Sequence, residues 1–182
     1  QNGWARSVRE LRPVDQQGQP LPWYSYAAID FLAPRLMSNF RAFDYGAGYS
    51  CLWYATRLLE VEAVTDSAAW QQEILAKGDV NLTIHLATEQ ERYVKSCGGK
   101  LPFQLINLGG HWRHDAARYA PQMLSGDGVL IWYDSDKMRD GAVQLELRQL
   151  GFRQLDFSGM GPISNRSWTT SIFYRRSNCL DI

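Results

Sequence analysis

The sequence has no excess of charge of either sign, because 19 lysine and arginine residues balance 19 aspartate and glutamate residues. Such a balance produces no overall field that would attract nucleic acid or an anionic membrane surface. The sequence also lacks an apolar run as long as a membrane-spanning helix, and its start lacks the apolar segment of a secretion signal. We therefore expect neither a nucleic-acid partner nor a membrane span.

Cysteine is scarce as well. Cys51, Cys97 and Cys179 lie far apart and form no C-x-x-C pair. This spacing argues against a disulfide framework and against a zinc site, and it suits a reducing compartment. We expect a cytoplasmic protein without a bound metal. Because the chain begins at Gln1 rather than at Met, we also expect it to be trimmed or cut from a longer protein.

The composition is that of a globular domain, with 45% hydrophobic and 21% charged residues among 182. Turn-forming residues gather near the start of the chain, at Pro13, Gly18, Pro20 and Pro22. Such residues predict irregular structure, and no linker or repeat divides the rest of the chain. We expect an irregular N-terminal arm at residues 1–22 and a single domain at residues 23–182.

Strands and helices alternate through that domain. After a helical segment at 24–38, the pattern predicts strands at 42–45, 62–65, 81–86, 103–108 and 128–133, each followed by a helix, at 50–59, 68–76, 89–96, 115–124 and 138–150. Two final strands, at 153–157 and 169–175, enclose a loop and no helix. Repeated strand–helix units predict a parallel sheet covered on both faces, and the ending predicts an antiparallel hairpin.

One stretch, Phe43-Asp44-Tyr45-Gly46-Ala47-Gly48-Tyr49-Ser50, is typical of a strand that ends in a glycine turn and continues as a helix. Glycine there tolerates positive φ and lets a ligand approach the backbone, while N–H groups of the next helix face that ligand. A dinucleotide site has a third glycine where this chain has Cys51, and no Lys-Ser or Lys-Thr pair follows as in a P-loop. The turn therefore predicts a small-molecule site of another kind.

An acidic residue two positions before Gly-x-Gly resembles the first motif of class I S-adenosylmethionine-dependent methyltransferases. Further segments, at 22–26, 105–113, 128–136, 151–162 and 170–175, agree in order and spacing. From about Gln19 to Arg176 the chain resembles a bacterial group of small methyltransferase-like proteins. The resemblance implies a Rossmann-like α/β class I methyltransferase fold, with a mainly parallel seven-stranded sheet and a terminal antiparallel hairpin. It also implies S-adenosylmethionine as cofactor.

The resemblance and the positions of residues at strand ends indicate a cofactor pocket beside the glycine turn. The resemblance implies that Asp44 holds the backbone amides of the turn or the ammonium group of the cofactor. The residues that we expect to bind the cofactor are Asp44, Tyr45, Gly46, Gly48, Ser50, Thr65, Asp66 and Leu108.

Three polar positions of the resembling group are replaced in this chain. In the resembling group an acidic residue binds the ribose of the cofactor. The corresponding residue here is Thr65, and Asp66 follows it directly. The Asp-Gly pair after the fourth strand is here Gly109-Gly110, and Tyr133 replaces an aspartate after the fifth strand. His111 is a candidate catalytic base in place of the lost aspartate, because histidine is the residue type that ordinarily titrates near neutral pH. The alternative is a loop histidine without a catalytic role.

The element Asp134-Ser135-Asp136 follows the fifth strand. Together with His111, His114 and Asp115 it could supply metal ligands, but nothing in the spacing enforces such a site. Capping of the following helix by Asp134 or Asp136 is the better interpretation.

The sequence supports two functional classes. Retention of Asp44, Gly46 and Gly48 narrowly favours a methyltransferase that uses S-adenosylmethionine and acts on an unknown acceptor, such as a small molecule or a glycan. The three replacements favour the alternative, a non-catalytic descendant (a pseudoenzyme) that keeps the fold as a binding or scaffold module. The sequence indicates no oligomeric state.

Overall fold

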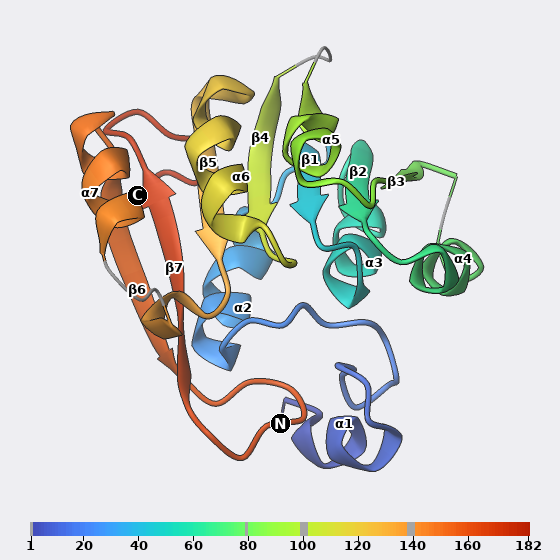
Figure 1. The fold of residues 1–182 in the computed structure, drawn as a ribbon. Coiled ribbons are helices and arrows are strands. Elements are labelled where there is room, and N and C mark those ends of the chain that lie inside the picture. The colour runs from blue at the N-terminus through green and yellow to red at the C-terminus, as the bar shows by residue number, and fades with distance from the viewer. Residues whose placement is uncertain (1, 79, 99–101, 138–140) are drawn as a thin grey trace.

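A twisted sheet runs through the centre of the molecule (Figure 1). The computed structural model describes residues 2–78, 80–98, 102–137 and 141–182. Within these residues the sheet has seven strands in the order β3-β2-β1-β4-β5-β7-β6. The strands are β1 Arg41–Tyr45, β2 Glu60–Thr65, β3 Leu82–Leu86, β4 Phe103–Leu108, β5 Leu124–Trp132, β6 Arg153–Gly159 and β7 Trp168–Tyr174. The first five are parallel, and β7 lies antiparallel between β5 and β6, which confirms the predicted fold class and the terminal hairpin.

Helices cover both faces of the sheet and enclose two apolar cores. Successive side chains of a strand point to opposite faces, so Ala42 of β1 enters one core and Phe43 enters the other. The first core packs against α2 Tyr26–Leu32, α3 Tyr49–Ala55 and α4 Ala68–Leu75. The second packs against α5 Gln90–Val94, α6 Arg113–Tyr119 and α7 Ala142–Gln149. Short 3₁₀ turns lie at Ala33–Arg35, Lys95–Cys97, Ala120–Gln122 and Ser135–Lys137.

The expectation of an irregular arm at residues 1–22 was wrong for its first part, where α1 spans Trp4–Glu10 (Figure 1). Residues 4–10 contain neither proline nor glycine, and the helix is tied to later parts of the chain. The Ser7 hydroxyl donates to the Val14 carbonyl at 2.6 Å and accepts from the Val14 amide at 3.0 Å. The Trp4 indole donates to the Ser164 carbonyl at 2.9 Å. The division of the chain at residue 22 stays a prediction.

Proline shortens two of the predicted helices. The helix expected at 24–38 ends at Leu32 and passes into a 3₁₀ turn that contains Pro34. The helix expected at 115–124 likewise ends at Tyr119, before the turn that contains Pro121, and Leu124 belongs to β5. The first residues of the helix expected at 138–150 lie outside the described residues. None of the helices in the described segments is long and apolar enough to cross a membrane.

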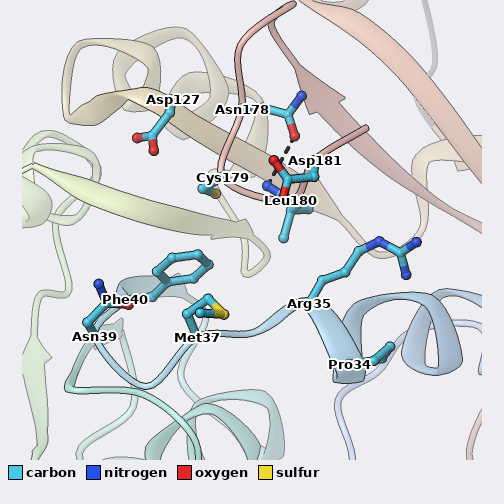
Figure 2. A pocket seen from close by; sticks show the side chains of 10 residues that line it. All are labelled: Pro34, Arg35, Met37, Asn39, Phe40, Asp127, Asn178, Cys179, Leu180 and Asp181. Carbon is cyan, nitrogen blue, oxygen red and sulfur yellow. Dashed lines mark hydrogen bonds between the residues drawn. The ribbon is translucent and has the colours of Figure 1, made fainter.

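The end of the chain folds back over the amino ends of the parallel strands. The Cys179 amide donates to the Asp127 carbonyl of β5 at 2.8 Å, and the side chain of Asn178 accepts from the Leu180 amide at 3.1 Å. Between this segment and residues 34–40 lies a cavity of about 630 Å³, whose lining side chains are shown in Figure 2. This cavity is at the opposite end of the sheet from the glycine turn, so it is separate from the predicted site.

Candidate functional site at the glycine turn

The glycine turn lies at the carboxyl end of β1, where the strand order reverses between β2 and β4. Gly46 has a φ of 100°, a conformation that side-chain-bearing residues rarely adopt, and α3 starts immediately after Gly48. In open α/β sheets such a reversal point is where small molecules bind. The structure therefore places the predicted turn at the expected edge of the sheet.

The turn touches the end of β4 through backbone atoms. A Cβ added to Gly46 would lie 2.6 Å from the Gly110 nitrogen, and one added to Gly109 would lie 2.5 Å from the Tyr45 carbonyl oxygen. Both distances are far shorter than a normal van der Waals contact. Glycine at 46 and 109 thus allows the two turns to pack closely, and neither position has room for a side chain.

The polar groups of the turn are largely occupied by protein. The amides of Gly46 and Ala47 both donate to the Val64 carbonyl of β2, at 2.9 and 3.0 Å. The Ala47 carbonyl accepts from the indole N–H of Trp70, which stands in the first turn of α4. The Trp70 ring also faces Gly48, because a Cβ there would lie 3.8 Å from it. Trp70 therefore covers the side of the turn that faces β2.

A cavity of about 220 Å³ remains beside the turn. Four of the eight residues predicted to bind the cofactor line it, namely Tyr45, Gly46, Gly48 and Ser50. The other lining residues are Trp23, Tyr24, Ala47, Trp70, Asn107, Gly109, Gly110 and Tyr133. The sequence gives little signal for Trp23 and Asn107, because only the folded sheet brings them to the turn.

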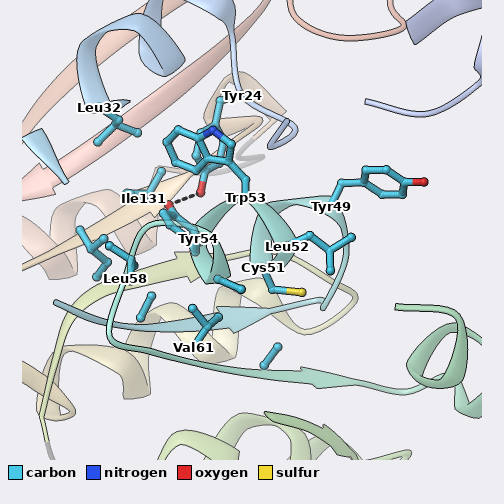
Figure 3. Packing of buried hydrophobic residues seen from close by; sticks show 14 of the residues in the cluster. Tyr24, Leu32, Tyr49, Cys51, Leu52, Trp53, Tyr54, Leu58, Val61 and Ile131 are labelled. Atoms are coloured by element: carbon cyan, nitrogen blue, oxygen red, sulfur yellow. Dashed lines mark hydrogen bonds between the residues drawn. The ribbon is translucent and has the colours of Figure 1, made fainter. Parts of the chain in front are cut away.

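Asp44 lies behind this cavity and is fully buried. Its carboxylate accepts from the Ser50 hydroxyl at 2.5 Å and from the Asn107 side-chain amide at 2.5 Å. Burial raises the pKa of Asp44 from 3.8 to about 6, while these two hydrogen bonds act in the opposite direction. The network continues from Asn107 to the Tyr24 hydroxyl, which donates to the Asn107 side-chain oxygen at 3.0 Å. The Tyr24 hydroxyl also contacts the Tyr54 hydroxyl at 2.7 Å (Figure 3).

Thr65, Asp66 and Leu108 are not among the described residues that line the cavity. Thr65 is buried, and its hydroxyl accepts from the Ser67 amide at 3.2 Å, within its own turn. Leu108 is fully buried in the second core. The Asp66 carboxylate pairs with Nδ1 of His111, whose side chain is 79% exposed. The candidate base thus bridges the ends of β2 and β4 on the surface rather than facing the cavity.

A second cleft, of about 410 Å³, adjoins this cavity and shares Trp23 and Tyr133 with it. The cleft is lined by Trp23, Arg113, Tyr133, Asp134, Lys137, Ser164 and Trp168. Arg113 forms an ion pair with the buried carboxylate of Asp134 and lies 5.4 Å from the centre of the Tyr133 ring. Sequence reasoning missed this cleft, because Trp23 and Trp168 come from opposite ends of the domain.

The expected capping role of Asp134 and Asp136 was wrong. The residue before α7 is Gly141, and no side chain caps that helix. Asp134 binds Arg113 instead, and Asp136 accepts from the Thr169 amide at 3.0 Å. Among the residues that the structure describes, no group of three or more acidic, histidine or cysteine side chains is placed to hold a metal ion.

No protein-family model matches the sequence, and no curated protein matches it. Solved structures do match. A TehB-like SAM-dependent methyltransferase from Corynebacterium glutamicum matches with a TM-score of 0.63 and 12% identity, over 95% of this chain and 96% of that one. An rRNA methylase from Streptococcus thermophilus has a TM-score of 0.60 and 19% identity, over 82% and 95%. Precorrin-6y C5,15-methyltransferase from Geobacter metallireducens has a TM-score of 0.61 and 13% identity, over 81% and 87%. The strand order and these likenesses show that the chain has the fold of class I S-adenosylmethionine-dependent methyltransferases.

Proposed function

We propose that this chain is a non-catalytic binding module with the methyltransferase fold. The observation that carries the proposal is the size of the cavity at the glycine turn, about 220 Å³. Sites for drug-sized ligands usually measure roughly 300–1,000 Å³. S-adenosylmethionine, which joins an adenosine to a methionine, is a ligand of that size. The cavity at the turn, taken without the adjoining cleft, is therefore smaller than the usual site of such a ligand.

The side of the turn that would receive the ribose supports the same conclusion. Thr65 is buried and its hydroxyl accepts from the Ser67 amide, so it is poorly placed to bind a ribose. Trp70 binds the carbonyl of Ala47 and thereby covers the turn toward β2. The pair formed by Asp66 and His111 joins the ends of β2 and β4 beyond it. A ribose would have to displace at least one of these contacts.

The chemistry available at the cavity also supports a non-catalytic role. Gly109 stands where the resembling group has an aspartate, and a side chain there would collide with the Tyr45 carbonyl. The ionisable groups among the described lining residues are the tyrosines Tyr24, Tyr45 and Tyr133. Burial raises the pKa of all three, so they keep their protons at neutral pH and supply no general base.

An active methyltransferase with a small-molecule or glycan acceptor is the second candidate. One observation favours it, namely the intact turn in which Gly46 keeps a positive φ and Asp44 stands behind it. Methyl transfer depends mostly on positioning, so the loss of one acid alone would not exclude it.

Calorimetric titration with S-adenosylmethionine and S-adenosylhomocysteine separates the two candidates. For the unmodified chain we expect no saturable binding below about 1 mM. Trp70→Ala opens the turn toward β2, and the double variant Trp70→Ala/Thr65→Glu adds an acceptor for the ribose, so the double variant should bind at least about tenfold more tightly than the unmodified chain. Micromolar binding by the unmodified chain would overturn the proposal and favour the methyltransferase.

A further inference from the structure

We propose that the cleft between Trp23, Tyr133 and Trp168 binds a planar aromatic monoanion, such as an aromatic carboxylate. This inference rests on the proposed function in one respect, because it names the class of ligand that the binding module would take. It does not depend on whether the glycine turn admits a nucleoside.

The size and walls of the cleft suit a single ring system. Its volume of about 410 Å³ lies within the usual range of small-molecule sites, roughly 300–1,000 Å³. Trp23 and Trp168 face one another with ring centroids 6.4 Å apart and planes inclined at 43°. Trp23 remains 39% exposed, although a large aromatic side chain gains most when it is covered. Stacking of a ligand ring on these walls would provide that cover.

The charged side chains that line the cleft favour a negatively charged ligand. Arg113 and Lys137 contribute two cations, and Asp134 contributes the one carboxylate among the described lining residues. Arg113 is committed to Asp134 by a direct ion pair. The Lys137 ammonium lies 3.8 Å from the same carboxylate, and its side chain is 71% exposed. Among the lining residues one positive charge is therefore in excess, and the exposed ammonium group of Lys137 can present it to a ligand.

Two polar groups beside the cleft take no part in contacting the ligand. The carboxylate of Asp136 accepts from the Thr169 amide and keeps its negative charge, but it does not line the cleft. Within the described part of the chain, the buried indole nitrogen of Trp168 has no hydrogen-bond partner. Because that nitrogen is buried, it offers no direct hydrogen bond to a ligand in the cleft.

The same geometry argues against the other charge states. An aromatic cage can hold an organic cation, but here Arg113 and Lys137 would repel it. A dianion would suffer repulsion from Asp134 once the single excess charge was neutralised. A monoanion matches the single excess positive charge of the lining residues.

The test uses three probes that share one ring system and differ in charge: indole-3-acetate, indole-3-acetamide and tryptamine. Their affinities for the full chain are measured by calorimetry or ligand-observed NMR at low ionic strength. We expect indole-3-acetate to bind at least about threefold more tightly than the neutral amide, and tryptamine to bind most weakly. Added salt should narrow the difference between the acid and the amide, because it screens an exposed charge.

Two variants locate the site. Lys137→Met keeps the apolar stem and removes the charge, so it should bring the affinities of the acid and the amide to the same value. Trp23→Ala should weaken all three probes. Both side chains are exposed, so neither change disturbs a core. Lys77→Met, just after α4, is the matched control and should leave the order of affinities unchanged.

Equal or tighter binding of tryptamine, an unchanged preference in Lys137→Met, or no binding of any probe would overturn the inference. These outcomes are independent of the nucleoside titrations. Methylation of the bound acid in the presence of S-adenosylmethionine would overturn the non-catalytic proposal and leave the anion site intact.

Discussion

The hydroxyl of Tyr24 donates a 3.0 Å hydrogen bond to Oδ1 of Asn107, and this bond decides which way the Asn107 amide points. The NH₂ group of Asn107 is left facing Asp44, to which it donates at 2.5 Å. Ser50 donates to the other oxygen of the same carboxylate at 2.5 Å. The buried network therefore directs its donors toward one acid, and it holds β1, β4 and α3 in register behind the glycine turn.

Asn107→Asp should destabilise the protein strongly at neutral pH. The substitution places a second carboxyl group within hydrogen-bond reach of Asp44 in a buried site, where two negative charges cannot coexist. We expect a loss of roughly 2–5 kcal/mol in the free energy of unfolding at about pH 7, and a much smaller loss at about pH 4.5, where the pair can share a proton. Urea unfolding at the two pH values measures the difference.

The matched control for this change is Asn39→Asp, which makes the same substitution at an exposed position. It should alter stability little at either pH. A loss in Asn107→Asp that did not depend on pH would mean that packing, rather than charge, explains the effect.

Asp44→Asn should change how stability depends on pH. The folded protein holds the proton of Asp44 more tightly than the unfolded chain, since the pKa rises from 3.8 to about 6. The stabilising contribution is therefore fully present below about pH 3.8 and is lost as the pH rises through about 6. Relative to Asp44→Asn, the wild-type protein should lose roughly 3 kcal/mol between about pH 4 and pH 7. Parallel denaturant titrations of both proteins test this, and a constant difference between them would contradict it.

Gly46→Ala should destabilise the fold by roughly 2–4 kcal/mol, because it combines strain at positive φ with overpacking. The added methyl group would lie 2.6 Å from the Gly110 backbone nitrogen. Gly126→Ala is the control, since a Cβ at position 126 of β5 meets no atom within 4 Å. Thermal unfolding followed by circular dichroism should show a clear decrease for the first variant and none for the second. Similar values for the two would show that the turns can move apart.

His111→Ala should leave stability nearly unchanged. His111 pairs with Asp66, but its side chain is 79% exposed, and exposed ion pairs contribute only about 0–1 kcal/mol. Equilibrium unfolding is again the measurement. A loss well above that range would assign His111 a structural role that its exposure does not suggest.

Much of the fold could be predicted from the sequence, because apolar residues recur through most strands and turn-forming residues separate the strands from the helices. The strand at Phe103–Leu108 has the predicted limits. The helix Trp4–Glu10 was not predicted, because it is stabilised by hydrogen bonds to Val14 and Ser164. These tertiary contacts leave no pattern in the local sequence. Prolines 34 and 121 were visible, but how far each shortens a helix depends on the turn that forms around it.

The site was predictable only in part. The glycine motif indicated where the turn would lie, and the strand ends indicated which loops surround it. The cover provided by Trp70 and the pairing of Asp66 with His111 could not be foreseen, since both join segments that meet only in three dimensions. The same is true of Trp23 and Trp168, which form the walls of the second cleft.

The contact between the turns at Gly46 and Gly109 also bears on how the protein can evolve. In a chain whose ancestor carried an acid at position 109, restoring it would push a Cβ against the Tyr45 carbonyl. The two turns would have to move apart to admit that side chain, so such a substitution carries a cost in stability. Close contact between two backbone turns therefore limits which residues position 109 can accept, independently of any ligand.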